Sequence, residues 1–462
     1  MRIALVYPAT EFDMQHHRDS LANGLLCLAS AVETAPGRQV DIFDSRHTQA
    51  IPDPKDFDRY DVVGFTAMSM QSLHAIDLAK QIRQRGYRGR IVFGGPHATV
   101  ATEHLKTIPE IDAIFLGEAE ATFPAFLSSL EGKDSPLGRV WIRGGDGGWR
   151  YPGEYPFVDD LDSLPWPARH KFGEFIRKSR FINILTSRGC PFNCNFCQPS
   201  KRILFGKRVR RRSVGNIASE IEDCVRRFDA NSFSIDDDTF TFDERAVLEF
   251  CGRIQGKGLF WSCQSRSDIS RDTLTAMKNA GCWMMFVGVE SGSQRMLDLM
   301  EKHNTVEANH RFIGWCNELG IKTWCNIILG YPGETEADMK LTLKFVDRAK
   351  PTWACVSQAT PFPGTFLWER NREDLVEVPW DAMARHTRLP KFRSMAALQP
   401  LIEEYTTEIS RGWERPVSPM DWSPPVDPWP GEVRRWTRRF KSSVKRWLGP
   451  RGTRIVKQVL RR

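Results

Sequence analysis

The chain lacks both a long hydrophobic run and a recognisable export segment. None of its apolar stretches approaches the roughly 18 residues that a membrane-spanning helix requires. The apolar N-terminal run ends at Pro8 and is too short for a secretory signal, so we expect a first β-strand there. Most of the 11 cysteines are scattered through apolar segments, which is typical of a reducing compartment rather than of a disulfide framework. These absences predict a cytoplasmic protein.

The chain is long, and its charge is unevenly distributed. Its 462 residues suffice for two or three domains, and a composition with 26% charged and 41% hydrophobic residues is typical of globular proteins. The formal net charge is +8, but residues 431–462 are crowded with Lys and Arg and hold one acidic residue, Glu432. The positive charge is therefore a property of the tail and not of the body.

Three cysteines lie close together in the middle of the chain. Cys190, Cys194 and Cys197 have the spacing Cys-x-x-x-Cys-x-x-Cys and follow an apolar run at 181–186. A fourth ligand is missing, since neither Cys nor His occurs between Cys197 and Cys224. Structural zinc needs four ligands at short spacing. Three thiolates instead suit a cubane iron–sulfur cluster with one iron left open, so the motif favours a [4Fe–4S] cluster over zinc.

Two strand–helix series occupy most of the chain. The apolar runs of the first series, in residues 1–137, lie at 3–7, 40–43, 62–65, 91–93 and 113–116. Those of the second, in residues 179–365, lie at 181–186, 232–235, 259–264, 284–289, 323–329 and 353–358. Such alternation predicts an α/β protein with parallel sheets and with ligands at the carboxyl ends of the strands. Residues 138–178, rich in Gly and Pro, are predicted to be a linker.

The loops that follow the strands of the first series carry glycines and hydroxyl groups. Glycine lets the backbone approach a flat or bulky ligand closely, and hydroxyl groups donate hydrogen bonds. Any one of these loops could simply turn the chain, so only their combination is informative. The residues concerned are Thr66, Ser69, Gly94, Gly95, His97, Gly117 and Glu118.

The cysteine motif, these loops and the segment Leu161-Asp162-Ser163-Leu164-Pro165-x-Pro167-Ala168 together resemble the cobalamin-dependent radical S-adenosylmethionine (SAM) enzymes, in particular the class B methyltransferases. The resemblance implies a Rossmann-like cobalamin-binding domain at 1–137, a linker at 138–178, a partial (β/α)6 TIM-like radical SAM barrel at 179–365 and a mostly helical C-terminal region at 366–462. It implies three cofactors: a [4Fe–4S] cluster on the three cysteines, SAM on the open iron, and cobalamin on the loops of the first domain. An electron donor such as flavodoxin or ferredoxin is also implied.

One feature departs from the wider group of cobalamin proteins. Many of them carry Asp-x-His-x-x-Gly after the first strand, and the histidine binds cobalt. Here the corresponding loop reads Asp13-Met14-Gln15-His16-His17-Arg18, with neither the spacing nor the glycine. We infer that no histidine of the protein binds the lower face of cobalt, as is usual in the radical SAM subgroup.

The resemblance also implies contacts with the polar groups of SAM. One of Asp236, Asp237 and Asp238 would accept hydrogen bonds from the SAM amino group; a turn, a helix cap or a divalent-metal site are the alternatives. Arg266 would pair with the SAM carboxylate, unless it is an ordinary surface arginine. Glu290 would accept hydrogen bonds from the ribose hydroxyls, with helix capping as its alternative.

Two further residues are assigned to the adenine end of SAM. The backbone at Gly330, after the fifth strand of the barrel, would line the adenine pocket. Phe196, directly before the last cysteine of the motif, would pack against adenine, against the core, or against both.

The function implied is methylation of an unactivated carbon in a small-molecule substrate by radical chemistry. A cobalamin-dependent rearrangement or oxidative cyclisation without methyl transfer is the alternative within the same architecture. An RNA-modifying methylthiotransferase fits less well, because that group carries a second three-cysteine cluster and only Cys27 lies in the N-terminal region here. The basic run at 207–212 is interpreted as a solvated face rather than as an RNA site, so no nucleic-acid partner is expected.

The tail has a composition of its own. Residues 416–430 are rich in proline and predict an extended connector. Residues 431–448 place Trp436 and Trp447 on the apolar face of a basic amphipathic helix, a pattern typical of peripheral contact with a membrane surface. A helix packed on the protein or an RNA-binding tail are the alternatives. Membrane contact would favour an apolar or lipid-like substrate.

Overall fold

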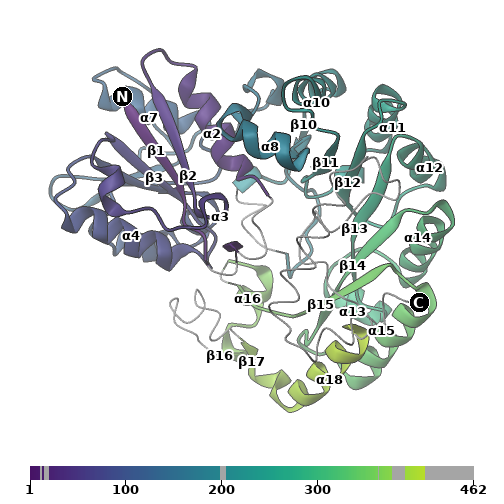
Figure 1. Ribbon diagram of the computed structural model, residues 1–462. Helices are drawn as coiled ribbons and strands as arrows, with labels where there is room; N and C mark the ends of the chain where they lie inside the picture. The colour runs from purple at the N-terminus through teal and green to yellow at the C-terminus, as the bar shows by residue number, and fades with distance from the viewer. Residues whose placement is uncertain (11–12, 15–19, 198–203, 363, 377–390, 411–462) are drawn as a thin grey trace, which may run out of the picture. The chain divides into compact units, whose positions relative to one another are not determined.

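The computed structural model describes residues 1–10, 13–14, 20–197, 204–362, 364–376 and 391–410 (Figure 1). All of these residues belong to one compact unit of the chain. Within this part of the chain, no helix is both long and apolar enough to cross a membrane. The predicted amphipathic helix at 431–448 and the proline-rich connector at 416–430 lie outside the described residues.

The first sheet is doubly wound, as the strand–helix alternation predicted. Its strand order is β2-β1-β3-β4-β5-β6-β7, and β1 to β5 are parallel. These five strands are β1 (Arg2–Tyr7), β2 (Gln39–Asp44), β3 (Val62–Thr66), β4 (Arg90–Gly94) and β5 (Ala113–Phe115). Alternate residues face opposite layers, since Ala4 and Val6 pack under α4 (Ser72–Gln84) and α6 (Thr102–Lys106). On the other face, Ile3 and Leu5 pack under α2 (Asn23–Glu33) and α7 (Thr122–Leu130).

The first sheet continues past residue 137, into the segment that we expected to be linker. Strands β6 (Val140–Arg143) and β7 (Trp149–Arg150) add to its edge in antiparallel orientation. The glycine-rich residues 144–148 form the turn between them, where Gly144 N–H donates to the Gly148 carbonyl oxygen at 2.7 Å. The glycines therefore mark a hairpin turn inside the sheet, and Gly content alone could not distinguish this from a connector.

The second sheet has six parallel strands in the order β15-β14-β13-β12-β11-β8. Helices cover its outer face, as Figure 1 shows for α11, α12 and α14. This is the partial (β/α)6 arrangement that the sequence predicted. The strands are β8 (Phe181–Ile184), β11 (Ser232–Ile235), β12 (Phe260–Ser265), β13 (Cys282–Glu290), β14 (Lys322–Leu329) and β15 (Trp353–Gln358). The helices are α10 (Val214–Phe228), α11 (Glu244–Ile254), α12 (Arg271–Asn279), α14 (Val306–Leu319) and α15 (Glu336–Ala349).

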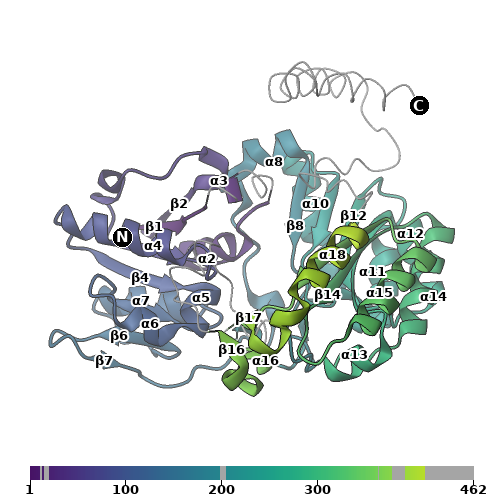
Figure 2. The same ribbon diagram turned by 90° about the horizontal axis from the view of Figure 1, so that it is seen from below.

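Side-chain caps start most of these helices at the positions that their sequences suggest. Ser213, Ser270 and Thr305 accept from backbone N–H groups in the first turns of α10, α12 and α14. Thr335 and Asp338 form a reciprocal capping box at the start of α15. After the sheet, α18 (Gln399–Ser410) packs against α15, as Figure 2 shows, and also against β15. The helical character expected of the C-terminal region is thus present in its described part.

Candidate active site

The three cysteines lie on a loop whose two ends are held together as a small hairpin. Strand β9 (Ser187–Arg188) pairs antiparallel with β10 (Arg210–Arg211), so that Arg188 lies opposite Arg210. Residues 189–209 connect these strands and include the cysteines. Gly189 has a φ of +94°, and a Cβ there would lie 2.4 Å from the Arg208 carbonyl oxygen, so glycine is required at this point. We call β9, β10 and the chain between them the cluster hairpin.

Cys190, Cys194 and Cys197 are all half-buried on this hairpin. The Cys197 N–H donates to the Cys194 carbonyl oxygen at 3.2 Å, which closes a turn between two of them. Burial raises the pKa of the Cys194 thiol, and the charges of Lys302 and Arg266 act in the opposite direction. Among the described residues, no three His, Cys, Asp or Glu side chains converge on a single metal ion. A cubane cluster binds each thiolate through a different iron, so three separate thiolates without a fourth ligand fit a [4Fe–4S] cluster.

Asn195 anchors the hairpin to later segments of the chain, around Met300, Tyr331 and Leu367, a role that the motif spacing did not reveal. Its side-chain amide donates to the Leu299 carbonyl oxygen at 2.8 Å, and its Oδ1 accepts from the Tyr331 hydroxyl at 2.7 Å. Its backbone N–H donates to the Met300 carbonyl oxygen, and its own carbonyl accepts from Leu367 N–H at 2.9 Å. A buried amide whose hydrogen-bonding groups are satisfied in this way fixes the chain between the second and third cysteines.

Two phenylalanines of the hairpin lie against buried cations of the second domain. The Arg266 guanidinium carbon is 3.9 Å from the ring centroid of Phe192, and Lys302 Nζ is 5.9 Å from that of Phe196. Phe196 also packs against the main core cluster, so the core-packing interpretation of this residue is confirmed. Its contact with adenine stays a prediction.

The three adjacent aspartates after β11 have different environments. Asp237 is buried, and its carboxylate accepts from Thr186 N–H at 2.7 Å, from Ser187 Oγ at 2.6 Å and from the Thr186 hydroxyl. Burial raises the pKa of Asp237, and these hydrogen bonds oppose the rise. Asp237 therefore holds the start of the cluster hairpin. Asp236 and Asp238 are half-buried, and Asp236 Oδ2 accepts from Asn183 Nδ2 at 2.8 Å. Contact of these aspartates with the SAM amino group stays a prediction.

Arg266 is buried at the end of β12, so the interpretation as a surface arginine is wrong. Its Nη1 and Nη2 donate to the carbonyl oxygens of Lys302 and His303 at 3.0 and 2.8 Å, and its Nε donates to Asp268 at 3.1 Å. The guanidinium thus ties the segment after α13 (Gln294–Leu299) to the cluster hairpin through Phe192. Pairing with the SAM carboxylate, which stays a prediction, would require some of these bonds to be exchanged.

Glu290 sits at an irregular point at the end of β13. The register against β14 shifts between Gly288 and Glu290, and Glu290 has a φ of +63°. Its carboxylate accepts from Lys302 Nζ at 2.7 Å, and both side chains are buried. A Cβ on Gly288 would lie 2.2 Å from Glu290 Oε1, so glycine makes room for this pair. Contact between Glu290 and the ribose stays a prediction, and Lys302 is a partner that sequence reasoning missed.

Gly330 lies at the corresponding end of β14 with a φ of +78°. Its N–H donates to Glu334 Oε2 at 2.5 Å, and burial raises the pKa of Glu334 to about 7. A Cβ on Gly330 would lie 3.0 Å from Ile402 Cδ1 of α18, so this end of the sheet is closely covered. The predicted role of Gly330 in the adenine pocket stays a prediction.

The loops predicted to hold cobalamin are hydrogen-bonded to one another at the carboxyl ends of β3, β4 and β5. His97 N–H donates to the Ala67 carbonyl oxygen at 2.9 Å, and the Gly117 N–H donates to Thr99 Oγ1 at 3.0 Å. Gly94 ends β4, and a Cβ on the next residue, Gly95, would lie 2.4 Å from Thr66 Oγ1. The structure therefore brings these three loops to one edge of the first sheet.

His97 joins the second of these loops to the first. Its Nδ1 lies 3.2 Å from Ser69 Oγ, and the imidazole is almost completely buried. Burial lowers the pKa of His97 to about 3, and His104 acts in the same direction. The ring is therefore neutral near pH 7, and this edge of the sheet gains no positive charge from it.

Glu118 is the exception among the predicted cobalamin contacts, because its carboxylate is engaged with the cluster hairpin. It accepts from Arg210 through both oxygens, one of them at 3.0 Å, and lies 3.3 Å from Arg188. The neighbouring Glu120 accepts from Arg188 at 2.5 Å. Burial alone would raise the pKa of Glu120, but Arg188 outweighs it and the pKa is lowered.

The basic run at 207–212 is not a solvated face throughout. Arg210 is buried against Glu118, and Arg212 lies 2.5 Å from Glu220 of α10 with a largely buried side chain. Arg208 is exposed and pairs with Asp159. Two of these cations therefore form internal ion pairs, which the run of charges alone could not indicate.

Comparison with known proteins agrees with this geometry. Residues 184–346 match the family described as the radical SAM superfamily, and residues 18–127 match the B12-binding domain. A relative from Pyrococcus horikoshii, named as an uncharacterized methyltransferase, is 31% identical over 80% of this chain and 83% of its own length. The chain belongs to the cobalamin-dependent radical SAM enzymes.

Two further likenesses concern proteins with named reactions. The anaerobic magnesium-protoporphyrin IX monomethyl ester cyclase of Rubrivivax gelatinosus is 29% identical over 69% of this chain and 59% of its own length. The structure of the radical SAM methyltransferase TsrM from Kitasatospora setae, with tryptophan and a SAM analogue bound, superposes with a TM-score of 0.71. It covers 89% of both chains at 16% identity, which shows a shared fold.

This radical SAM enzyme uses a [4Fe–4S] cluster, SAM and cobalamin. Cys190, Cys194 and Cys197 are the residues present that would hold the cluster, and the carboxyl ends of β11 to β14 would hold SAM. The joined loops at the edge of the first sheet would hold cobalamin. Sequence reasoning missed Asn195 and Lys302, because neither belongs to a motif. Asn195 holds the hairpin in place, and Lys302 holds Glu290.

Proposed function

We propose that this enzyme methylates an unactivated carbon of a small-molecule substrate. In such chemistry the cluster and SAM supply a carbon radical and cobalamin supplies the methyl group, so the protein must present one substrate to both cofactors. The uncharacterized methyltransferase from Pyrococcus horikoshii favours methyl transfer, and one structural observation supports a reaction that uses both cofactors. The loop after β5, at the edge proposed for cobalamin, is ion-paired with the hairpin that carries the cysteines.

The side chains of the second domain have separate tasks in this proposal. Asp236 or Asp238 would orient SAM by accepting hydrogen bonds from its ammonium group, while Glu290 would accept from the ribose hydroxyls. Lys302 Nζ donates to the Glu290 carboxylate at 2.7 Å and so fixes its orientation. The backbone of Glu290 itself is in the left-handed conformation. Because Glu290 and Lys302 are buried, this pair would hold the ribose end of SAM with little competition from water.

Anaerobic reconstitution with iron, sulfide and hydroxocobalamin tests this function. After incubation with SAM and a reductant, we expect both 5′-deoxyadenosine, from the radical step, and S-adenosylhomocysteine, from transfer of the SAM methyl group to cobalamin. Formation of 5′-deoxyadenosine by a protein that binds no cobalamin would remove the methylation proposal and leave the radical one.

Cyclisation or rearrangement is the second candidate, and the likeness to the protoporphyrin ester cyclase favours it. The same assay separates the two, because a reaction without methyl transfer consumes SAM to 5′-deoxyadenosine without forming S-adenosylhomocysteine. We also propose flavodoxin or ferredoxin as the electron donor, since the cluster must be reduced by one electron before each SAM cleavage.

Residues 431–462 are proposed to contact a membrane surface, which would suit an apolar or lipid-like substrate. The support is the sequence pattern alone: basic residues on one helical face and tryptophans on the other. Co-sedimentation with anionic liposomes should be lost when these residues are deleted. Equal partition of the full and shortened chains into the supernatant would contradict the proposal.

A further inference from the structure

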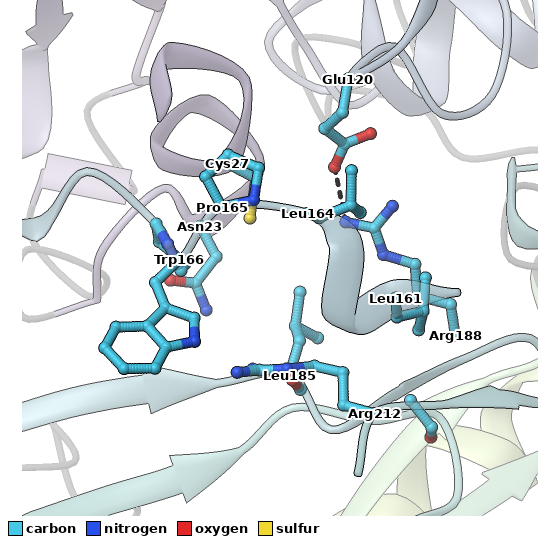
Figure 3. A pocket seen from close by; sticks show the side chains of 12 residues that line it. Asn23, Cys27, Glu120, Leu161, Leu164, Pro165, Trp166, Leu185, Arg188 and Arg212 are labelled. Atoms are coloured by element: carbon cyan, nitrogen blue, oxygen red, sulfur yellow. Dashed lines mark hydrogen bonds and ion pairs between the residues drawn. The ribbon is translucent and has the colours of Figure 1, made fainter. Parts of the chain in front are cut away.

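The loop of residues 117–120 in the first domain forms ion pairs with the base of the cluster hairpin. Arg188 and Arg210 lie opposite each other in β9 and β10, and both pair with Glu118. Arg188 also pairs with Glu120, as Figure 3 shows. All four side chains are about nine-tenths buried or more. Charges buried at this depth interact more strongly than surface pairs, provided that each has its partner.

The same loop reaches the edge of the first sheet where the cobalamin loops meet. The N–H of its first residue, Gly117, donates to Thr99 Oγ1 in the short helix α5 (Gly95–Val100), which directly follows β4. Gly117 has a φ of +70°, and a Cβ there would lie 3.1 Å from the carbonyl oxygen of Leu204, on the returning limb of the cluster hairpin. Residues 117–120 therefore touch the proposed cobalamin edge at one end and the cluster hairpin along their length.

The hairpin is also fixed on its barrel side. Asp237 holds Thr186 and Ser187, which directly precede Arg188. Next to the ion pairs lies a small, partly open pocket lined by Cys27, Leu164, Trp166 and others (Figure 3). With the barrel side fixed and the charges of Arg188, Arg210 and Glu118 paired in buried positions, the position of residues 117–120 and that of the hairpin base depend on each other.

We propose that Glu118 and Glu120 couple the cobalamin site to the cluster site. Cobalamin bound against residues 117–120 holds the two glutamates in place and thereby stabilises the hairpin on which the cluster is bound. By thermodynamic linkage, a bound cluster tightens cobalamin binding by the same factor. Glu118 is then a positioning residue that faces the hairpin and not a direct cobalamin contact. The inference rests on the cofactors of the family and does not require methyl transfer.

Equilibrium binding of hydroxocobalamin, measured by difference absorption under anaerobic conditions, tests the coupling. The affinity is compared between cluster-loaded and cluster-free forms of the full chain. We expect the cluster to tighten binding at least about 5-fold in the parent protein, the lower end of typical coupling between sites. We call the affinity of the cluster-loaded form divided by that of the cluster-free form the affinity ratio. In Glu118→Gln and Glu120→Gln the affinity ratio should fall to near 1, because a neutral amide cannot replace the ion pairs.

Glu131→Gln is the matched control. Glu131 lies in the same domain and also pairs with a buried arginine, Arg38, at 3.0 Å, but that pair is not connected to the cluster hairpin. Its ratio should equal that of the parent. A parent ratio of 1, or a parent-like ratio in both Glu118→Gln and Glu120→Gln, would overturn the proposal.

If the glutamine variants fold poorly, a second variant and a second readout still test the coupling between the two cofactor sites. Arg210→Lys keeps the charge but cannot make the two-pronged contact with Glu118, so an intermediate ratio is expected. The rate of iron loss to a chelator should fall when cobalamin is added to the parent and change less in Arg210→Lys. Equal protection of both proteins would contradict the coupling. Neither readout depends on product formation, so failure of the methylation proposal would leave both results unchanged.

Discussion

Lys302 and Glu290 form a buried ion pair, 2.7 Å between Nζ and Oε1, beneath the hairpin that carries the cysteines. The pair joins the end of β13 to the segment whose carbonyl oxygens hold Arg266. Lys302 also lies near the Phe196 ring and acts electrostatically on Cys194. A single lysine thus connects the proposed ribose acceptor with the cluster loop.

Replacing Lys302 with methionine should leave Glu290 buried without a counter-charge. Loss of one partner from a buried pair costs about 3–5 kcal/mol, so the free energy of unfolding should fall by that order. The double variant Lys302→Met, Glu290→Gln should recover part of the loss. Lys340→Met, which breaks an exposed 2.7 Å pair with Glu336, is the control and should cost less than about 1 kcal/mol. Urea unfolding measures all four proteins; equal losses for Lys302→Met and Lys340→Met would contradict the role of burial.

Changing Cys190, Cys194 or Cys197 singly to alanine should abolish stable cluster binding. Each substitution leaves only two thiolates for a cubane that needs three. Iron and sulfide content after anaerobic reconstitution, together with the visible absorption band, gives the measurement. Cys355→Ala, at a half-buried cysteine of β15 away from the motif, should reconstitute normally. Full iron content in any of the three motif variants would exclude that cysteine as a ligand.

Gly117→Ala should weaken both folding and cobalamin binding. The backbone there has a φ of +70°, which costs a non-glycine residue about 1–2 kcal/mol, and the new methyl group would also press on Leu204 and Arg139. Gly132→Ala is a close control: its φ is +79°, but no described atom lies within 4 Å of the added carbon. Gly117→Ala should lose more unfolding free energy than Gly132→Ala. Only Gly117→Ala should lose affinity for hydroxocobalamin. Identical behaviour of the two variants would mean that the contact has no effect.

Glu334 should make stability depend on pH near neutrality. Burial raises the pKa of Glu334 from 4.5 to about 7 in the folded protein, so the folded state binds the proton more tightly than the unfolded state. The stabilising contribution of the protonated form is complete below about pH 4.5 and is lost as pH rises through 7, a total of roughly 3 kcal/mol. Glu334→Gln should remove this dependence when unfolding is followed between pH 5.5 and 8. The exposed Glu336→Gln serves as control, and a parent-like pH profile in Glu334→Gln would refute the assignment.

Spacing and periodicity were sufficient to predict the parts of the fold that depend on local pattern. Strands β11 and β15 have the predicted bounds, and the cysteine motif lies on the loop after the first strand of the second sheet. Strands β6 and β7 were missed, because residues 144–148 between them have the glycine content of a linker. In addition, β6 pairs with β5, a tertiary contact that no local pattern indicates.

The least predictable features were the partners of charged residues. Arg210 pairs with Glu118, 92 positions earlier, and no local pattern distinguishes such an arginine from a solvated one. The same holds for Arg266, whose acceptors are backbone carbonyl oxygens 36 and 37 residues away. The loops at the edge of the first sheet came together as expected, since parallel strands end at a common edge, but the direction of the Glu118 side chain depended on a domain that follows much later in the sequence.

The long sequence separations at the base of the cluster hairpin also bear on the order in which the protein matures. Glu120 and Arg188 are 68 positions apart, and the antiparallel pairing of Arg188 with Arg210 encloses all three cysteines. Contacts of this range form late, after the local units that carry them have folded. During synthesis Cys190, Cys194 and Cys197 therefore emerge before Arg210, so the base of the hairpin closes only after all three cysteines have been made.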